Sequence, residues 1–369
     1  MTAMISRRAF LGGLAGTAAL AGTSLSLPAL ARSTFGPAPG IIRLSANENP
    51  YGPSPKALQA IADAAAKGAY YPGAVRNELV NMIASANGID ADGVVMSSGS
   101  AEALSAATVA WAKQGRIIAP ELTFGAHLNY AQRLGARIQR IPLTAEMDTD
   151  LAAMEAAIDD DVSMVYVCNP NNPTGIAIDP DALRAFCRRV SPRAVVLIDE
   201  AYNELAADPA KQSMMDLVRA GENVIVMRTF SKIFGLAGLR IGYSMSKPEH
   251  AEVIGQHVMS WPNVAGFAAA VATFDDSAFL EFSKAKVAEG RELVVDTFRR
   301  HEVPVLATEA NFVYADIGRN ADEFQQRMAA RGVQIRGIYK PYSTFSRVSM
   351  GRIEDLEVFA RVFHEEYSA

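Results

Sequence analysis

The feature that most constrains the fold is an alternation of short apolar runs with amphipathic stretches between about residues 94 and 245. The runs are typical of strands buried on both faces, and stretches such as Ser100–Lys113 have a helical pattern. Strands that alternate with helices predict an α/β fold with a mainly parallel sheet covered on both sides. The expected seven strands are Val94–Ser97, Arg116–Ala119, Ala136–Pro142, Met164–Cys168, Ala194–Ile198, Val224–Arg228 and Ile241–Met245.

The chain has 369 residues, enough for one large domain and one smaller domain. After about residue 262 the pattern changes to a long helical stretch, Ser277–Arg300, followed by short strands and helices. This change predicts a smaller α+β domain. We therefore expect an N-terminal arm over residues 32–60, a large domain over residues 61–262 and a small C-terminal domain over residues 263–369.

Residues 1–31 have the pattern of a secretory signal. Arg7-Arg8 precede Phe10-Leu11 and a Gly/Ala/Leu run, and Ala29-Leu30-Ala31 has the small-x-small pattern of a cleavage site. The order of these residues resembles a twin-arginine signal, which exports folded, often cofactor-loaded proteins. An uncleaved anchor is the alternative, but the run falls short of the ~20 strongly apolar residues of a membrane span. We expect a periplasmic protein with no stable membrane association after processing, or otherwise a cytoplasmic one.

Composition disfavours several classes of protein. The net charge of −5, without a Lys/Arg run, argues against a nucleic-acid partner. The five histidines are scattered, so no metal site is expected. Cys168 ends an apolar run and Cys187 lies in a helical stretch, which favours buried free thiols over a disulfide.

Four short patterns stand where predicted strands pass into helices, where parallel sheets place their binding groups. Ser97–Glu102 is a small-residue turn whose amides suit a phosphate, or only a helix cap. Asn169–Gly175 directly follows an apolar strand, although its Asn, Pro and Gly residues are also typical of an ordinary turn. Asp199 ends an apolar strand, where a carboxylate needs a cationic partner unless it caps a helix. Lys232 lies in the Thr229–Arg240 loop, and by itself a solvated loop charge would explain it.

Together the four patterns resemble the class I and II aminotransferases of pyridoxal 5′-phosphate (PLP) fold type I, and are most similar to the histidinol-phosphate aminotransferase branch. The resemblance runs from about Ile42 to the C-terminus. It implies a fold type I transferase with a large sheet domain and a smaller α+β domain. The segments that carry it are Ala46–Pro55, Tyr71-Pro72, Asn171–Gly175, Ser231–Arg240, Glu309–Phe312 and Arg347–Gly351.

The resemblance also implies roles for single residues. Lys232 matches the Schiff-base lysine, which becomes the base that moves the α-proton. Asp199 matches the partner of the pyridine nitrogen, and Tyr202 and Asn172 match residues that bond the phenolic oxygen. Phe124 matches an aromatic residue that stacks on the ring, although a core position would equally suit it. The residues implied to hold the cofactor phosphate are Ser100, Ala101, Thr229, Ser231 and Arg240.

Four more residues are implied to complete the site. Tyr71 matches a tyrosine that reaches the phosphate from a neighbouring subunit, which implies a homodimer with shared sites. Tyr51 and Arg347 match substrate-contacting positions, with Arg347 on the anionic group of the substrate and Arg336 as a second anion contact.

We therefore expect a PLP-dependent aminotransferase that acts on a small amino donor, histidinol-phosphate-type or other, and a 2-oxo acid such as 2-oxoglutarate. A PLP-dependent decarboxylase or oxidase on the same scaffold is the first alternative. A non-enzymatic PLP- or amine-binding protein is the second. Such a protein would not need the catalytic set of Lys232, Asp199 and Tyr202 together with Asn172 and Arg240. A nicotinamide dehydrogenase is disfavoured because residues 32–369 contain no G-x-G-x-x-G motif.

Overall fold

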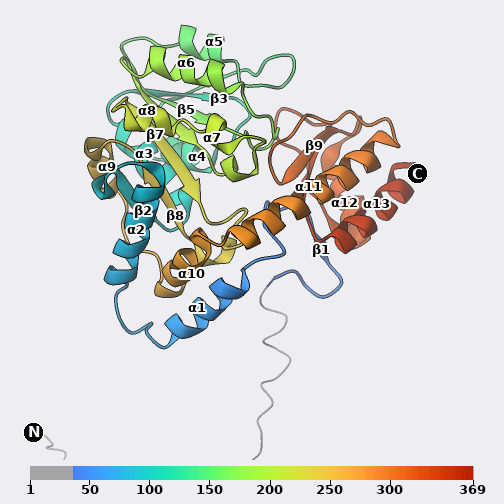
Figure 1. Ribbon diagram of the computed structural model, residues 1–369. Helices are drawn as coiled ribbons and strands as arrows, with labels where there is room; N and C mark the ends of the chain where they lie inside the picture. Colours follow the sequence, from blue (N-terminus) through green and yellow to red (C-terminus); the bar gives the residue numbers. More distant parts are fainter. Residues whose placement is uncertain (1–35, 369) are drawn as a thin grey trace, which may run out of the picture. The chain divides into compact units, whose positions relative to one another are not determined.

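The computed structural model describes residues 36–368, and those from Ile41 onward form one compact unit (Figure 1). Residues 36–40 belong to a separate unit and form an exposed turn. The expected signal lies outside the described residues.

A seven-stranded sheet is the centre of the unit, in the order β2-β8-β7-β6-β5-β3-β4. Strand β8 runs antiparallel to β2 and β7, and the other neighbouring strands of this sheet pair in parallel. All seven expected strands are confirmed, with ends that differ by a few residues. The strands are β2 (Val94–Ser97), β3 (Arg116–Pro120), β4 (Ile138–Ile141), β5 (Val162–Cys168), β6 (Val195–Asp199), β7 (Val224–Thr229) and β8 (Gly242–Met245).

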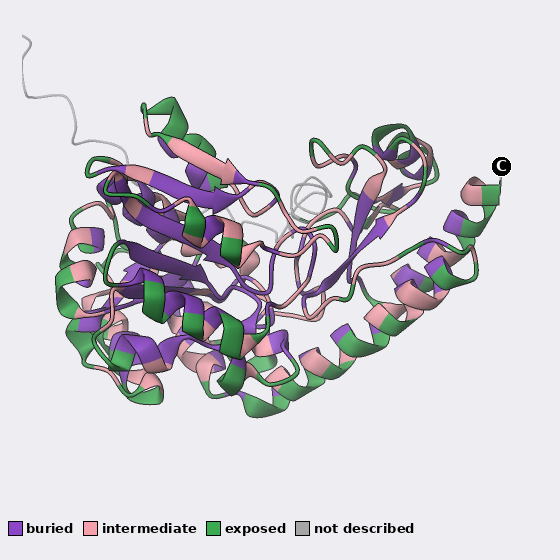
Figure 2. Cartoon of the chain, turned by 90° about the horizontal axis from the view of Figure 1, so that it is seen from above, coloured by how far each residue is buried: buried purple, intermediate pink, exposed green. Residues whose placement is uncertain are grey.

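Helices cover both faces of this sheet, so the central strands β5 and β6 are buried at every residue except Ser163 (Figure 2). On one face, Leu197 packs in a cluster with residues of α3, α4 and α9. On the other face, Val196 and Ile198 pack in a cluster that includes residues of α2, α6 and α8. Successive strand residues thus point to opposite faces, as the pleat requires. These helices are α2 (Gly73–Asn87), α3 (Ser100–Ala112), α4 (Ala126–Arg133), α5 (Leu151–Ala156), α6 (Pro180–Val190), α7 (Pro209–Gln212), α8 (Met215–Arg219) and α9 (Pro248–Gly255).

The C-terminal part has the mixed α and β elements expected from its sequence. Strand β9 (Phe312–Asp316) pairs antiparallel with β11 (Phe345–Ser349), and in this register Arg347 lies opposite Tyr314. Strand β1 (Ile42–Arg43) pairs with β10 (Val333–Gln334), so residues 42–43 of the expected N-terminal arm join this part. The domain boundaries remain a prediction. The remaining helices are α1 (Pro55–Ala65), α10 (Val264–Phe274), α11 (Ser277–Arg299), α12 (Ala321–Ala330) and α13 (Ile353–Ser368).

Candidate active site

A cavity of about 310 Å³ lies where the parallel strands end. Asp199 is the last residue of β6 and Thr229 the last of β7, and α3 begins just after β2. The cavity contains ten of the eleven residues expected to bind the cofactor; only Tyr71 is elsewhere. The ten are Ser100, Ala101, Phe124, Asn172, Asp199, Tyr202, Thr229, Ser231, Lys232 and Arg240.

Lys232 is partly buried at the wall of this cavity. Its Nζ donates a hydrogen bond to the backbone oxygen of Asn47 at 3.1 Å and lies 5.4 Å from the ring centroid of Tyr202. Burial, and next the charge of Arg347, lower the pKa of Lys232 to about 8. A lysine with this pKa is neutral in part at physiological pH, so it can act as a nucleophile or a base.

Asp199 is buried and has no cation bonded to it among the described residues. Burial raises the pKa of its carboxyl group to about 6. The carboxylate accepts hydrogen bonds at 3.2 Å from the Tyr166 hydroxyl and from the Ala201 amide. The sequence did not identify Tyr166. Its signal is its place on β5, on the face of the sheet that also carries Asp199.

Asn172, Tyr202 and Arg347 form one hydrogen-bonded network. The hydroxyl oxygen of Tyr202 accepts bonds from Nδ2 of Asn47 at 2.8 Å and of Asn172 at 3.3 Å. Nη1 of Arg347 donates to Oδ1 of Asn172 at 2.7 Å. Ser349 Oγ donates to Oδ1 of Asn47 at 2.6 Å, so both ends of that amide are used. Asn47 is a second missed residue, although it stands in the Ala46–Pro55 segment.

A group of donors gathers where α3 starts. Gly99 precedes the helix with φ +77° and no side chain caps it, so its first amides are open to a ligand. Nη1 of Arg240 donates to Ser231 Oγ at 3.3 Å, and Thr229 Oγ1 lies 2.9 Å from the same oxygen. Added to Gly99, a Cβ would lie 2.2 Å from Nη2 of Arg240, so a side chain there would displace the guanidinium. This arrangement suits a phosphate.

Arg347 and Arg336 line a second cavity of about 750 Å³, which shares Asn47, Phe124, Asn172 and Lys232 with the first. Arg347 is buried, and its Nε has no hydrogen-bond partner among the described residues. The Arg336 amide donates to the backbone oxygen of Arg347 at 2.9 Å, which holds the two arginines side by side. Nη1 and Nη2 of Arg347 donate to neutral oxygens, those of the Asn172 side chain and the Ser45 backbone, at 2.7 and 3.0 Å. A buried guanidinium with a free Nε and only neutral partners indicates an anionic ligand in the cavity.

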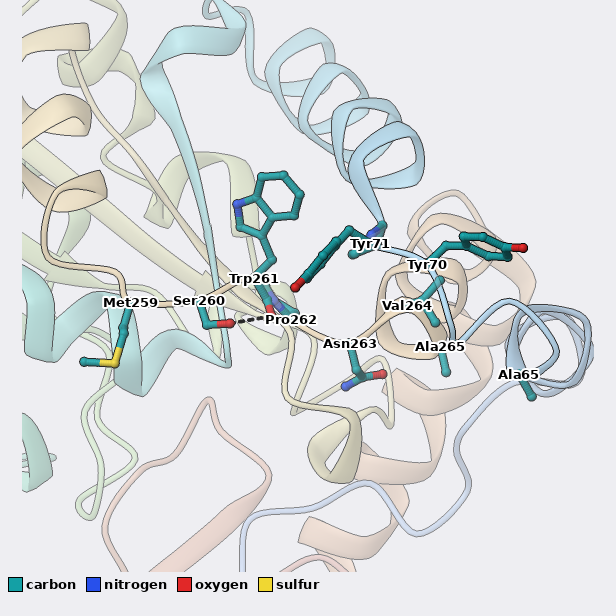
Figure 3. A pocket seen from close by; sticks show the side chains of 12 residues that line it. Ala65, Tyr70, Tyr71, Met259, Ser260, Trp261, Pro262, Asn263, Val264 and Ala265 are labelled. Atoms are coloured by element: carbon teal, nitrogen blue, oxygen red, sulfur yellow. Dashed lines mark hydrogen bonds between the residues drawn. The ribbon is translucent and has the colours of Figure 1, made fainter. Parts of the chain in front are cut away.

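Tyr51 and Tyr71 are not brought into either cavity. The Tyr51 hydroxyl accepts a hydrogen bond from the Ile353 amide at 3.0 Å. Tyr71 is 93% exposed and lines a separate hollow of about 870 Å³ with Tyr70, Met259 and Trp261, which we call the Tyr71 hollow (Figure 3).

Other expectations can be compared with the described part of the chain. Cys168 and Cys187 are buried free thiols, as expected. Within residues 36–368, no cluster of His, Cys, Asp or Glu suits a metal ion. No described helix has the length and apolar character of a membrane span.

Known proteins are similar to this chain in fold and in sequence. Residues 39–363 match the family model "Aminotransferase class I and II". A histidinol-phosphate aminotransferase of Moorella thermoacetica is 36% identical over 329 residues, which are 88% of this chain and 85% of that protein. Histidinol-phosphate aminotransferase 2 of Pseudomonas aeruginosa is 35% identical over 324 residues, 86% of this chain and 87% of that protein. The crystal structure of the Sinorhizobium meliloti histidinol-phosphate aminotransferase in complex with pyridoxal-5′-phosphate has a TM-score of 0.82 and 26% identity, and covers 94% of this chain and 99% of that one.

Proposed function

Because the chain belongs to the class I and II aminotransferases and is a PLP-dependent transaminase, we propose that its donor carries an anionic group, as histidinol phosphate does, and that its acceptor is a 2-oxo acid such as 2-oxoglutarate. The observation that carries the proposal is the position of Arg347, a buried guanidinium with a free Nε in the cavity that also contains Lys232.

The residues of the smaller cavity fit PLP. Asp199, buried without a cation, would hold the pyridine nitrogen, and Tyr202 with Asn172 would hold the phenolic oxygen. Phe124 would cover one face of the ring. The donors around Arg240 would hold the phosphate. When bound, PLP takes up the electrons that are released as the α-proton of the substrate leaves.

The side chains of the protein then have separate tasks. Nζ of Lys232 removes the α-proton and returns a proton in the next step, because its lowered pKa lets it hold or release a proton near neutral pH. Asp199 stays ionised while it faces a cation, and the Tyr166 hydroxyl keeps the carboxylate in place. Arg347 fixes the anionic end of the substrate, so that the α-carbon lies within reach of Lys232.

Release of the oxo product in a single half-reaction tests this function. Purified protein loaded with PLP is mixed with one amino donor and no acceptor. A transaminase releases at most one equivalent of the ketone or 2-oxo acid that corresponds to the donor, whereas a decarboxylase releases carbon dioxide and an oxidase consumes dioxygen continuously. The proposed donor class fails if Arg347→Lys leaves the KM of every anionic donor unchanged, since lysine keeps the charge but loses the bidentate fork.

Borohydride should fix the cofactor on the peptide that contains Lys232, and labelling of another lysine would refute that residue's role.

We also propose that two copies form a homodimer through the Tyr71 hollow. Tyr71 is 93% exposed, Met259 95% and Trp261 50%. Exposed apolar side chains gathered in one hollow are typical of an interaction surface. A second copy is the expected occupant, because the family supplies the tyrosine at the position of Tyr71 to the neighbouring site. Sedimentation of the purified protein measures its mass in solution, and an active monomer would contradict the proposal.

Export is a further proposal that rests on residues 1–31 alone. It places the enzyme in the periplasm, loaded with PLP beforehand, where it would act on amines outside cytoplasmic histidine synthesis. Cells are fractionated after expression of the wild-type chain and of an Arg7→Lys, Arg8→Lys variant. The wild type should be periplasmic and begin at Arg32, whereas the variant should stay cytoplasmic at full length. Retention of both in the cytoplasm would overturn the proposal.

A further inference from the structure

The cavity of about 750 Å³ that Arg347 and Arg336 line contains further cationic side chains besides these two arginines. Its described lining contains five cationic side chains and one carboxylate, that of Glu121. None of the five forms an ion pair with a described carboxylate. A cavity with this surplus favours anions. The five are Arg140, Lys232, Arg336, Lys340 and Arg347.

Arg140 stands apart from the others because it comes from the large sheet. It is the third residue of β4, whereas Arg336, Lys340 and Arg347 come from the C-terminal part of the chain. Cationic side chains therefore line the cavity from β4, from the loop that carries Lys232 and from the C-terminal part. A substrate with a single anionic group needs only the pair Arg336 and Arg347.

The surroundings of Arg140 leave its guanidinium available. The side chain is partly buried, and its only hydrogen bond among the described residues runs from Nη1 to the Pro120 oxygen at 3.2 Å. A guanidinium has five N–H donors, so most of them are free for a ligand. Gly125 faces the guanidinium, and a Cβ there would lie 3.4 Å from Nη2. Gly125 is also the N-cap of α4, which has no side-chain cap. Its neighbour Phe124 lines both cavities, so this place adjoins the proposed cofactor site.

We infer that Arg140, with Lys340, forms a second anion subsite that binds the distal carboxylate or phosphate of a substrate whose near end lies at Lys232 and Arg347. This inference rests on the proposed function, since it takes Arg347 as the first anion contact. It specifies the substrate class as amines with two anionic groups, such as an amino dicarboxylate or a phosphorylated amino acid.

Matched donor pairs test the subsite. Glutamate and glutamine differ in a distal carboxylate against a neutral amide of the same shape, and O-phosphoserine and serine differ in a distal phosphate. We expect the wild type to prefer the charged member of at least one pair tenfold or more in kcat/KM. Arg140→Gln should reduce that preference at least tenfold, mainly through KM, because it removes a charge-assisted hydrogen bond. Arg140→Lys should restore part of it.

The control is Arg133→Gln, which removes an equal charge from the exposed surface of α4 and should leave both preferences unchanged. The pair that responds to Arg140→Gln identifies the distal group as carboxylate or phosphate. Unchanged preferences for both pairs in Arg140→Gln would overturn the subsite.

A binding measurement separates this inference from the proposed function, because it needs no turnover. Glutarate, a dianion, and butyrate, a monoanion, are titrated into the PLP-loaded protein and followed by the absorbance of the cofactor. Arg140→Gln should raise the Kd of glutarate at least tenfold and change that of butyrate less than twofold. Equal changes for the two ligands would refute the subsite even in an active enzyme. Inactivity with every anionic donor would instead refute the proposed function.

Discussion

The smaller cavity, whose residues fit PLP and which we call the cofactor cavity, differs from the Tyr71 hollow in how its side chains are held. In the cavity, Asp199 is buried and bonded to Tyr166, and Tyr202 is bonded to Asn47 and Asn172. In the hollow, Tyr71 and Met259 are more than nine-tenths exposed. The polar groups of the cavity are fixed by bonds within one chain, whereas the apolar groups of the hollow are still in contact with water.

This difference separates two ways to prepare a site. Strand ends fix the cavity residues before any ligand arrives, which keeps the cost of organising them out of the binding step. The hollow gains its stabilisation only when a partner covers the exposed aromatic rings. Substitutions in the cavity should therefore change chemistry or folding of the single chain, and those in the hollow should change assembly.

The largest expected effect is on chemistry at Asp199. Asp199→Asn should slow α-proton removal by about three orders of magnitude or more, because the amide no longer stabilises a cationic ring nitrogen. Deuterium exchange at the α-carbon of the donor measures this rate. Near-normal exchange would limit the role of Asp199 to the turn that it stabilises through its hydrogen bond with the Ala201 amide.

The same substitution should stabilise the cofactor-free protein at neutral pH. Burial raises the pKa of Asp199 from 3.8 to about 6, so the folded chain binds more protons than the unfolded chain between these values. Stability from this group therefore falls as pH rises through that window, and the cost reaches ~3 kcal/mol above pH 6. Thermal unfolding of both proteins at pH 4 and pH 7 measures the difference, which should be larger at pH 7.

The next largest effect concerns the interior support of the cavity. Glu200, fully buried beside Asp199, accepts bonds from Nε and Nη2 of Arg228 at 3.0 and 2.8 Å. Glu200→Gln should destabilise the protein by ~3–5 kcal/mol, because it removes the fully buried carboxylate that is bonded to the partly buried Arg228 guanidinium. Urea unfolding checks this value. Glu155→Gln, which breaks an exposed pair with Arg189, should cost only ~0–1 kcal/mol. Equal costs for the two variants would argue against a structural role for the buried pair.

A smaller effect is expected in the hollow. Trp261→Glu should weaken the proposed dimer by ~2 kcal/mol, about thirtyfold in Kd, because it places a charge in an apolar contact. Analytical ultracentrifugation over a concentration series measures this change. Tyr130→Glu alters another exposed aromatic residue, on α4, and should leave the Kd unchanged. An equal loss in both variants would exclude the hollow as the interface.

The smallest effect is the pH response of Lys232. Burial lowers its pKa from 10.5 to about 8, so in cofactor-free protein its acylation rate should level off above a midpoint near pH 8. The unfolded chain binds more protons between pH 8 and 10.5, so stability from this group rises with pH across that window. Mass spectrometry of the labelled peptides measures the rate, with exposed Lys67 as the reference. A midpoint near 10.5 would show that Lys232 is well solvated.

The large sheet and most residues of the cofactor cavity could be predicted from sequence patterns. Apolar runs such as Val195–Ile198 can only be buried, and alternation with helices makes them parallel, so Asp199 and Thr229 had to meet at one edge. The motifs around Lys232 then identified the residues in those loops. These apolar runs and motifs are short, continuous stretches of sequence, so they can be recognised without the structure.

Contacts between residues of distant segments could not be predicted in this way. Tyr166 bonds Asp199 because β5 and β6 pair in one register, and Asn47 bonds Tyr202 across 155 positions of the chain. Arg140 lines the same cavity of about 750 Å³ as Arg347, because β4 and β11 place these two side chains around one space. Tyr166 and Arg140 have no local motif that sets them apart from ordinary residues, and the Ala46–Pro55 segment does not show which residue Asn47 contacts. Their roles come from contacts, and contacts between distant segments depend on register and packing rather than on any short run of sequence.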